Sequence, residues 1–153
     1  MKVYGFSRVE FIEYLTINSI TDATVENFKE EFFISILSSG GPMAEPVFSQ
    51  LHSNVLTIQF DDVDADISKW GQDVGHMVEA KAITESHALT LIKFIDSIPS
   101  FARINIHCVY GISRTGALAK FLEEYRGAEI YCKQLDNLNG KVFSLLKSVA
   151  KLR

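Results

Sequence analysis

The segment 103–116 constrains the fold of this 153-residue chain more than any other. Residues 104–108 form an apolar, β-prone run, a short loop containing Gly111 follows, and residues 115–125 have the pattern of a helix. A strand, a tight loop and a helix in this order direct backbone N–H groups and the positive end of a helix dipole toward one point. The segment therefore predicts a binding site for a phosphate-like oxyanion.

Two side chains of this segment add chemistry to the predicted anion site. Cys108 ends the strand-like run and is expected at the floor of the loop, where the field that holds an anion also stabilises a thiolate. Arg114 follows six positions later, and its planar guanidinium matches two oxygens of a tetrahedral dianion, which a lysine does not. The pattern predicts a cysteine nucleophile beside an arginine that binds the oxyanion.

Strand-like and helix-like segments alternate along the rest of the chain. Runs rich in β-branched and aromatic residues predict strands at 2–6, 32–37, 55–60 and 128–132. Capping residues and apolar spacing predict helices at 7–15, 84–98 and 138–152. Segment 18–31 is polar and compatible with a short helix that packs Val25 and Phe28, and 38–50 is expected to be a loop.

The alternation predicts an α/β fold, a three-layer sandwich with a mainly parallel central sheet. The length fits a single domain, 1–153, without an internal repeat or linker. Ligands of such sheets bind beyond the carboxyl ends of the strands. The loop after Cys108 and the aspartate-rich segment 61–66 are both expected at that edge.

Composition excludes several other classes of protein. A net charge of −4 and the absence of a Lys or Arg block argue against binding nucleic acid. The N-terminal segment is too polar for a signal peptide, and no apolar run approaches membrane-spanning length, so we expect a protein of the cytoplasm that does not bind a membrane. Two cysteines are too few for a disulfide framework.

Residues 107–115 read His-Cys-Val-Tyr-Gly-Ile-Ser-Arg-Thr. This run resembles the signature of the cysteine-based protein tyrosine phosphatases, in which His-Cys is followed by five residues, Arg, and Ser or Thr. Looser similarities at 7–10, 40–42, 60–63 and 112–114 make the chain look like a compact group of bacterial tyrosine phosphatase-like proteins. That group is similar in fold to the small dual-specificity phosphatases.

The resemblance implies a phosphotyrosine protein phosphatase-like fold and hydrolysis of phosphotyrosine on proteins or peptides, with dual specificity left open. It implies a phosphocysteine intermediate on Cys108, with neither a metal nor a cofactor. His107 and Thr115 would support the nucleophile. The phosphate would be bound by Val109, Tyr110, Gly111, Ile112, Ser113 and Arg114. The uncharged side chains at 109–113 argue against phosphoinositide substrates, whose phosphatases carry lysines there.

The family also implies an aspartic acid upstream of the cysteine that protonates the leaving group. Segment 61–66 offers Asp61, Asp62, Asp64 and Asp66. Asp62 matches the family position best, while Asp61 and Asp64 stay open as alternatives. A calcium loop is rejected, because its sixth position is Ile67 where glycine is needed.

Other interpretations of the same residues remain open. The chain could be a pseudophosphatase that binds phosphorylated partners without turnover, or another thiolate enzyme such as a sulfurtransferase or arsenate reductase. Cys132 is interpreted as a small core residue, with a redox role beside Cys108 as the alternative, and Trp70 as a hydrophobic plug rather than a lid. His52, His76 and His87 lack metal-ligand spacing. The sequence leaves the physiological substrate and the oligomeric state open.

Overall fold

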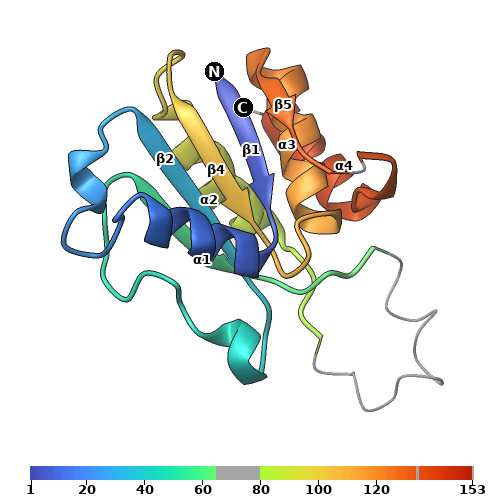
Figure 1. The fold of residues 1–153 in the computed structure, drawn as a ribbon. Helices are drawn as coiled ribbons and strands as arrows, with labels where there is room; N and C mark the ends of the chain where they lie inside the picture. Colours follow the sequence, from blue (N-terminus) through green and yellow to red (C-terminus); the bar gives the residue numbers. More distant parts are fainter. Residues whose placement is uncertain (65–79, 134, 153) are drawn as a thin grey trace.

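The computed structural model describes residues 1–64, 80–133 and 135–152 (Figure 1). Within these residues a five-stranded, all-parallel sheet has the order β3-β2-β4-β1-β5. The strands are β1 (Lys2–Phe6), β2 (Glu31–Leu37), β3 (Val55–Gln59), β4 (Arg103–His107) and β5 (Glu129–Tyr131). The predicted α/β class with a parallel sheet is confirmed.

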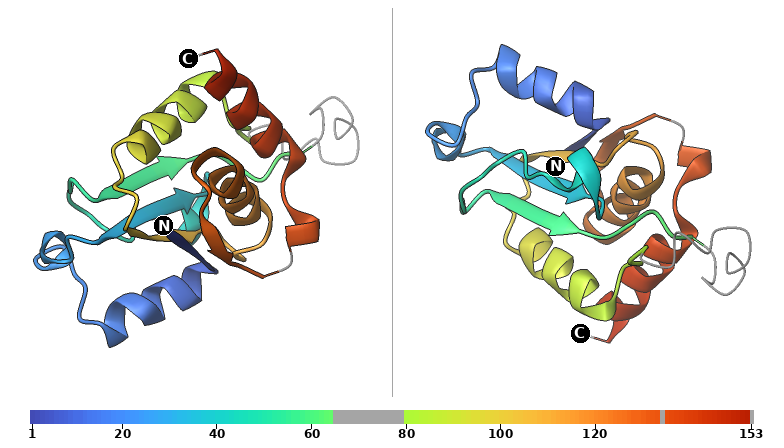
Figure 2. Two further views of the ribbon diagram at one scale, coloured as in Figure 1. Left: turned by 90° about the horizontal axis from the view of Figure 1, so that it is seen from above. Right: turned by 90° about the horizontal axis from the view of Figure 1, so that it is seen from below.

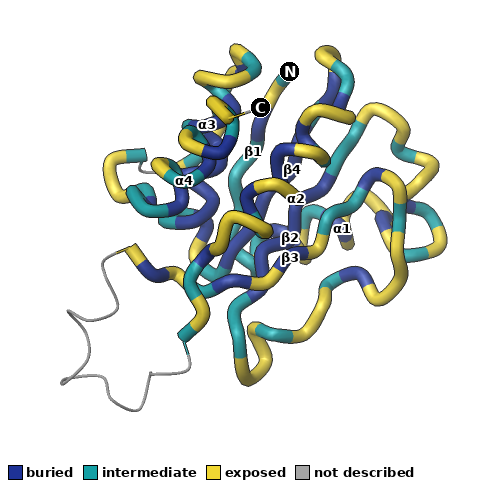
Figure 3. The backbone as a smooth tube through the Cα atoms, turned by 180° about the vertical axis from the view of Figure 1, so that it is seen from behind, coloured by how far each residue is buried: buried dark blue, intermediate teal, exposed yellow. Residues whose placement is uncertain are grey.

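The strand before the cysteine, β4, lies at the centre of the sheet. It pairs with β2 on one side and with β1 on the other, so its backbone groups are bonded along both edges. Ile104 and Ile106 are fully buried, and Figure 3 shows β4 and β2 as the most buried strands. A run of apolar residues buried on both faces is what a central parallel strand requires.

The helices cover the two faces of the sheet unequally. Helix α1 (Arg8–Ile17) lies on one face, and α2 (Glu85–Asp96), α3 (Ser113–Arg126) and α4 (Gly140–Lys151) lie on the other (Figure 2). Phe11 and Leu15 of α1 pack against Phe33 and Phe48. The apolar faces of α2, α3 and α4 form a larger cluster with Ile34, Ile58, Ile104 and Ile106 of the sheet.

Two of the helix starts follow the sequence signals closely. The Ser7 hydroxyl accepts from the Glu10 N–H, and the Glu10 carboxylate accepts from the Ser7 N–H, so the expected capping box is formed. Thr84 caps α2 through the N–H of His87. Both N-caps inferred from the sequence are confirmed.

The predicted start of the last helix was wrong by two residues. We expected a helix over 138–152, whereas α4 begins at Gly140 because the Asn139 side chain accepts from the Val142 N–H and caps it. At the other end, Leu152 lies just beyond the helix and is 87% exposed.

Smaller differences concern strand ends and loops. Strands β3 and β4 end one residue early, so Phe60 and Cys108 lie just beyond them. Two 3-10 turns, Val25–Asn27 and Gly41–Ala44, interrupt segments 18–31 and 38–50. Val25 is buried as expected, and Phe28 packs beside it. None of the described helices has the length and apolar character needed to cross a membrane.

Candidate functional site

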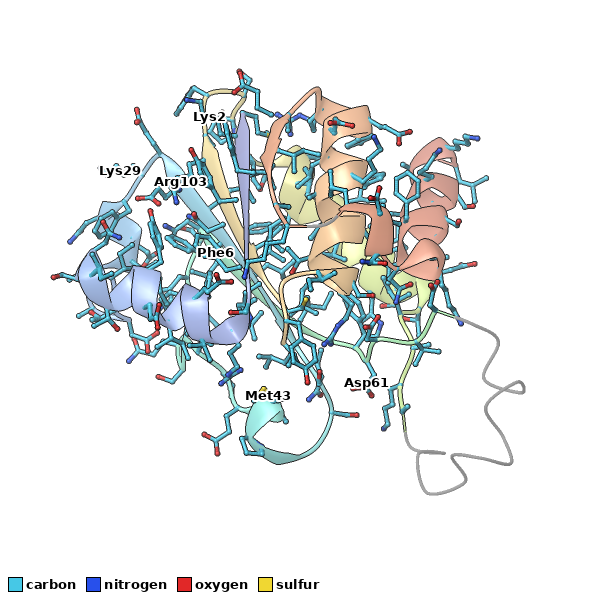
Figure 4. The ribbon with its side chains drawn as sticks, turned by 45° about the vertical axis from the view of Figure 1, so that its right-hand side comes forward. Lys2, Phe6, Lys29, Met43, Asp61 and Arg103 are labelled. Atoms are coloured by element: carbon cyan, nitrogen blue, oxygen red, sulfur yellow. The ribbon has the colours of Figure 1, made fainter. Side chains whose placement is uncertain are left out.

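The carboxyl edge of the sheet contains a cavity of about 900 Å³. In Figure 4, Asp61 lies at this edge, at the end of the sheet opposite Lys2 and Arg103. The lining of the cavity includes two segments that the sequence predicted to meet there, the loop after β4 and the loop after β3. Its lining residues are Ser38, Ser39, Gly40, Asp61, Asp62, Val63, Ala80, Lys81, Val109, Tyr110 and Arg114.

The cysteine loop (residues 108–114) connects β4 to α3. Cys108 itself is 2% exposed, while Val109 and Tyr110 of the same loop line the cavity. The Val109 carbonyl accepts a hydrogen bond of 3.1 Å from the N–H of Arg8, the first residue of α1. The loop is thereby attached to the start of a second helix.

Gly111 explains why the cysteine loop contains a glycine. Its φ is +73°, and a Cβ on it would lie 2.4 Å from the carbonyl carbon of Phe6 and 2.5 Å from the nitrogen of Ser7. A side chain is excluded both by the backbone conformation and by this close approach. The loop can fold against the end of β1 only with glycine at this position.

Helix α3 differs from the other helices at its first turn. Ser7, Thr84 and Asn139 cap α1, α2 and α4, whereas no side chain among the described residues caps α3. The N–H groups at a helix start are unsatisfied within the helix and carry a partial positive charge. At α3 these groups follow the cysteine loop directly, an arrangement suited to an anion.

Arg114 belongs to the first turn of α3 and is 3% exposed. Its Nη1 donates to the Phe60 carbonyl at 2.7 Å, which ties the start of α3 to the end of β3. Its Nε and the Oγ1 of Thr115 are buried and have no hydrogen-bond partner among the described residues. Buried donors without partners are costly, and oxygens of a bound anion would satisfy the guanidinium.

His107 is fully buried directly before Cys108. Its Nδ1 lies 3.2 Å from the Cys108 carbonyl oxygen, and its Nε2 lies 2.6 Å from the Ser35 hydroxyl. Burial, helped by the charges of Arg8 and Arg114, lowers the pKa of His107 to about 4. The ring is therefore neutral at pH 7, with one nitrogen donating and the other accepting.

Among the predicted acids, Asp61 is held in a structural role. Its carboxylate accepts from the N–H groups of Ser39 and Lys81, at 2.8 and 2.7 Å, and from the Ser39 hydroxyl. Burial disfavours the charged carboxylate, but these hydrogen bonds and the charge of Arg114 outweigh it and lower the pKa of Asp61. A carboxylate stabilised in its ionised form is poorly suited to donate a proton.

Asp62 faces the cavity and has two hydrogen-bond donors on one oxygen. The Ser113 hydroxyl and the Asn139 side-chain amide both donate to Asp62 Oδ1, each at 2.7 Å. Asp64 lies instead at the start of α4, where its Oδ1 accepts from the Lys141 N–H at 2.9 Å. Asp66 and Trp70 lie outside the described residues.

The structure thus brings Asp62, Arg114 and the cysteine loop to one cavity. Sequence reasoning missed Asn139, because the predicted helix already included that position. A signal was present, since Asn three residues before an apolar helix position is a common N-cap pattern. It also missed Ser35, whose contact with His107 joins β2 to the end of β4 and has no local signal.

The remaining candidates among the described residues do not line the cavity. Cys132 is half-buried, and both cysteines are free thiols. Burial raises the pKa of Cys132 to about 11, against the effect of a hydrogen bond with the Gly5 backbone. This fits the packed residue that we expected, and a redox role stays a prediction. His52 contacts Asp22 and Glu26, His87 takes part in the cap of α2, and His76 lies outside the described residues.

We compared the chain with models of known protein families, with curated proteins and with solved structures, and none of the three comparisons found a match.

Proposed function

We propose that this protein is a phosphatase that hydrolyses phosphate monoesters through a phosphocysteine intermediate on Cys108. The substrate class that we propose is phosphotyrosine on proteins or peptides. The proposal rests above all on one observation: the buried guanidinium of Arg114 and the carboxylate of Asp62 meet at the cavity beside the cysteine loop. Displacement at phosphorus by a thiolate requires an anion-binding group for the equatorial oxygens and a proton donor for the leaving oxygen.

In the first step the Cys108 thiolate attacks phosphorus in line with the ester oxygen. An S–P bond forms and the P–O bond to the leaving group breaks. Asp62, protonated at the start, gives its proton to the departing oxygen. Arg114 and the N–H groups of the cysteine loop bind the three equatorial oxygens, whose charge is thereby stabilised.

In the second step water attacks the phosphocysteine. Asp62, now a carboxylate, takes a proton from the water, the S–P bond breaks, and inorganic phosphate leaves. The Cys108 thiolate is regenerated, and the Thr115 hydroxyl stabilises it by donating a hydrogen bond. Neutral His107 fixes the Cys108 carbonyl, so the nucleophile keeps its position through both steps.

The rim of the cavity supports an aromatic phosphate as substrate. Tyr110 is 75% exposed beside the cavity and offers a ring against which a phosphotyrosine ring can pack. The loop side chains around it carry no charge, which favours a peptide over a highly charged lipid headgroup. With this function we propose the phosphotyrosine protein phosphatase-like fold and a place in the cytoplasm, as the sequence resemblance implies.

The direct test compares wild-type protein with Cys108→Ser on an aryl phosphate. The variant should lose turnover, because serine is far less acidic than cysteine, while it still binds orthovanadate or phosphate and unfolds at a similar denaturant concentration. Chelation with EDTA should leave wild-type turnover unchanged. Variant activity within tenfold of wild type would refute the thiolate mechanism.

The same assay separates the alternative functions. A pseudophosphatase would bind phosphate without turnover in the wild type. A sulfurtransferase or arsenate reductase would consume thiosulfate or arsenate but leave aryl phosphates intact.

A further inference from the structure

Asn139 lies outside the cysteine loop and outside segment 60–64, and it contacts the proposed proton donor, Asp62. It is fully buried, and each end of its side chain has a different task. Its Oδ1 accepts from the Val142 N–H at 2.9 Å, which caps α4, and its Nδ2 donates to Asp62 Oδ1 at 2.7 Å. An N-cap needs only the oxygen, so the amide donor is free for a second function.

The backbone around Asn139 fixes this geometry further. The Asn139 N–H donates to the Ser113 carbonyl at 2.9 Å, while the Ser113 hydroxyl donates to the same Asp62 oxygen. Asp64 accepts from the N–H of Lys141, the second residue of α4. The acid loop (residues 60–64) is thus fastened to the beginnings of α3 and α4, and Asn139 lies where all three segments meet.

We propose that Asn139 is a positioning residue that orients the carboxyl of Asp62 and reserves its Oδ2 for the transferable proton. Within the described part of the chain, both hydrogen bonds that Asp62 accepts arrive at Oδ1. A protonated carboxyl has its hydrogen on the oxygen that is not already accepting from donors. Two donors on Oδ1 therefore leave Oδ2 as the oxygen that delivers the proton to the leaving group.

This inference rests on the proposed phosphatase activity, but its central contact can be tested without turnover. Asn139→Asp keeps an equally good N-cap and places a carboxylate against Asp62, so the urea midpoint at pH 7 should fall. Adding Asp62→Asn to that variant restores the hydrogen bond between the two side chains. The donor is now the amide at position 62, and the acceptor is the carboxylate at position 139. The midpoint should return to that of Asp62→Asn alone.

Kinetics then separate positioning from simple support of the helix. Asn139→Ser keeps the cap and loses the donor, so kcat on phenyl phosphate should fall about 10- to 100-fold with KM little changed. The loss should shrink for esters of acidic phenols, which need less protonation. Val149→Ala, in the same helix, controls for lost stability and should show no leaving-group dependence.

The outcomes distinguish the two proposals. The role of Asn139 would be overturned if the changes in urea midpoint of the two single variants simply added in the double variant. It would also be overturned if Asn139→Ser lowered kcat equally for all leaving groups. Either result would leave the phosphatase proposal intact. Absence of hydrolysis by the wild type would overturn the proposed phosphatase activity. The urea midpoints would then be the test of whether Asn139 holds Asp62.

Discussion

The cysteine loop and the acid loop face the same cavity but are held in different ways. The cysteine loop is fixed by backbone contacts and buried groups: Val109 bonds to the start of α1, Gly111 lies against the end of β1, and His107 anchors the strand before it. The acid loop is held mainly through its own side chains, with Asp61 bonded to Ser39 and Asp62 to Asn139. One loop is held mainly through its backbone, and the other mainly through its side chains.

The difference has a functional meaning under the proposed mechanism. A cradle for an oxyanion must be preorganised, since moving its dipoles during the reaction would cost free energy. A proton donor can be set by a few hydrogen bonds, provided that they leave one oxygen available. Substitutions in the two loops should therefore have distinguishable effects on turnover, phosphate binding and stability.

The largest expected effect comes from removing the acid. Asp62→Asn should lower kcat on phenyl phosphate about 10²- to 10⁴-fold, the range of general acid catalysis, because the phenolate then leaves without a proton. Phosphate binding should persist, since the cysteine loop is untouched. The check is a series of esters with leaving groups of decreasing pKa, along which the loss should shrink. Asn substitutions at Asp61, Asp64 and Asp66 are the controls, and leaving-group dependence in one of those would move the assignment there.

Gly111→Ala should damage the other loop. Alanine must adopt a φ of +73° and place its Cβ within 2.6 Å of three backbone atoms of Phe6 and Ser7. We expect the free energy of unfolding to fall by about 3 kcal/mol or more. Phosphate binding should be lost as well. Gly41→Ala is a matched control, because its φ is +63° but a Cβ meets nothing within 4 Å, so only about 1–2 kcal/mol should be lost. Equal urea midpoints for the two variants would show that the contact is not rigid.

Acid should weaken the cysteine loop through His107. The pKa of His107 is about 4 in the folded protein, against 6.5 for an unperturbed histidine, so between these values the unfolded chain binds more protons. The contribution of His107 is complete above about pH 6.5 and is lost as the pH falls through 4, by about 3 kcal/mol at most. Urea midpoints between pH 7.5 and 4 measure this loss. His107→Asn should flatten the slope, whereas Asp62→Asn should keep it.

The smallest effect concerns the two cysteines. Iodoacetate at pH 6, one equivalent, should label Cys108 at least about tenfold faster than Cys132, because Cys108 reacts as a thiolate under the proposed mechanism. Burial, which raises the pKa of Cys132 to about 11, has the opposite effect there. Peptide mapping of the labelled protein gives the ratio. Equal labelling would mean that the loop confers no special reactivity.

The elements that could be predicted from sequence are those with local causes. The capping box at Ser7, the apolar strand before Cys108 and the strand-loop-helix around Cys108 each depend on residues a few positions apart. The parallel sheet followed from the alternation of such elements. Its order, with β4 between β2 and β1, was not predicted, because it depends on which apolar faces fit together.

The candidate site also combines features with local causes and features that depend on distant segments. The sequence placed Arg114 and the cysteine loop together because six residues of tight loop and helix allow little else. It could not choose among neighbouring aspartates, since Asp61 and Asp62 differ only in the partners that distant segments supply. Asn139 and Ser35 depend on contacts over more than seventy positions.

The pairing of β1 with β4 joins Lys2 to Arg103 and Phe6 to His107. Parallel pairing across so much intervening chain is a slow, late event in folding, because the entropy of closing the loop is lost before the contacts form. Gly111 can settle against Phe6 only after that event. A chain still being synthesised, or one that has not closed this loop, therefore lacks the folded cysteine loop around Cys108. Under the proposed mechanism, reactivity of the cysteine is in this sense a late product of folding, and its appearance during refolding would report when the centre of the sheet has closed.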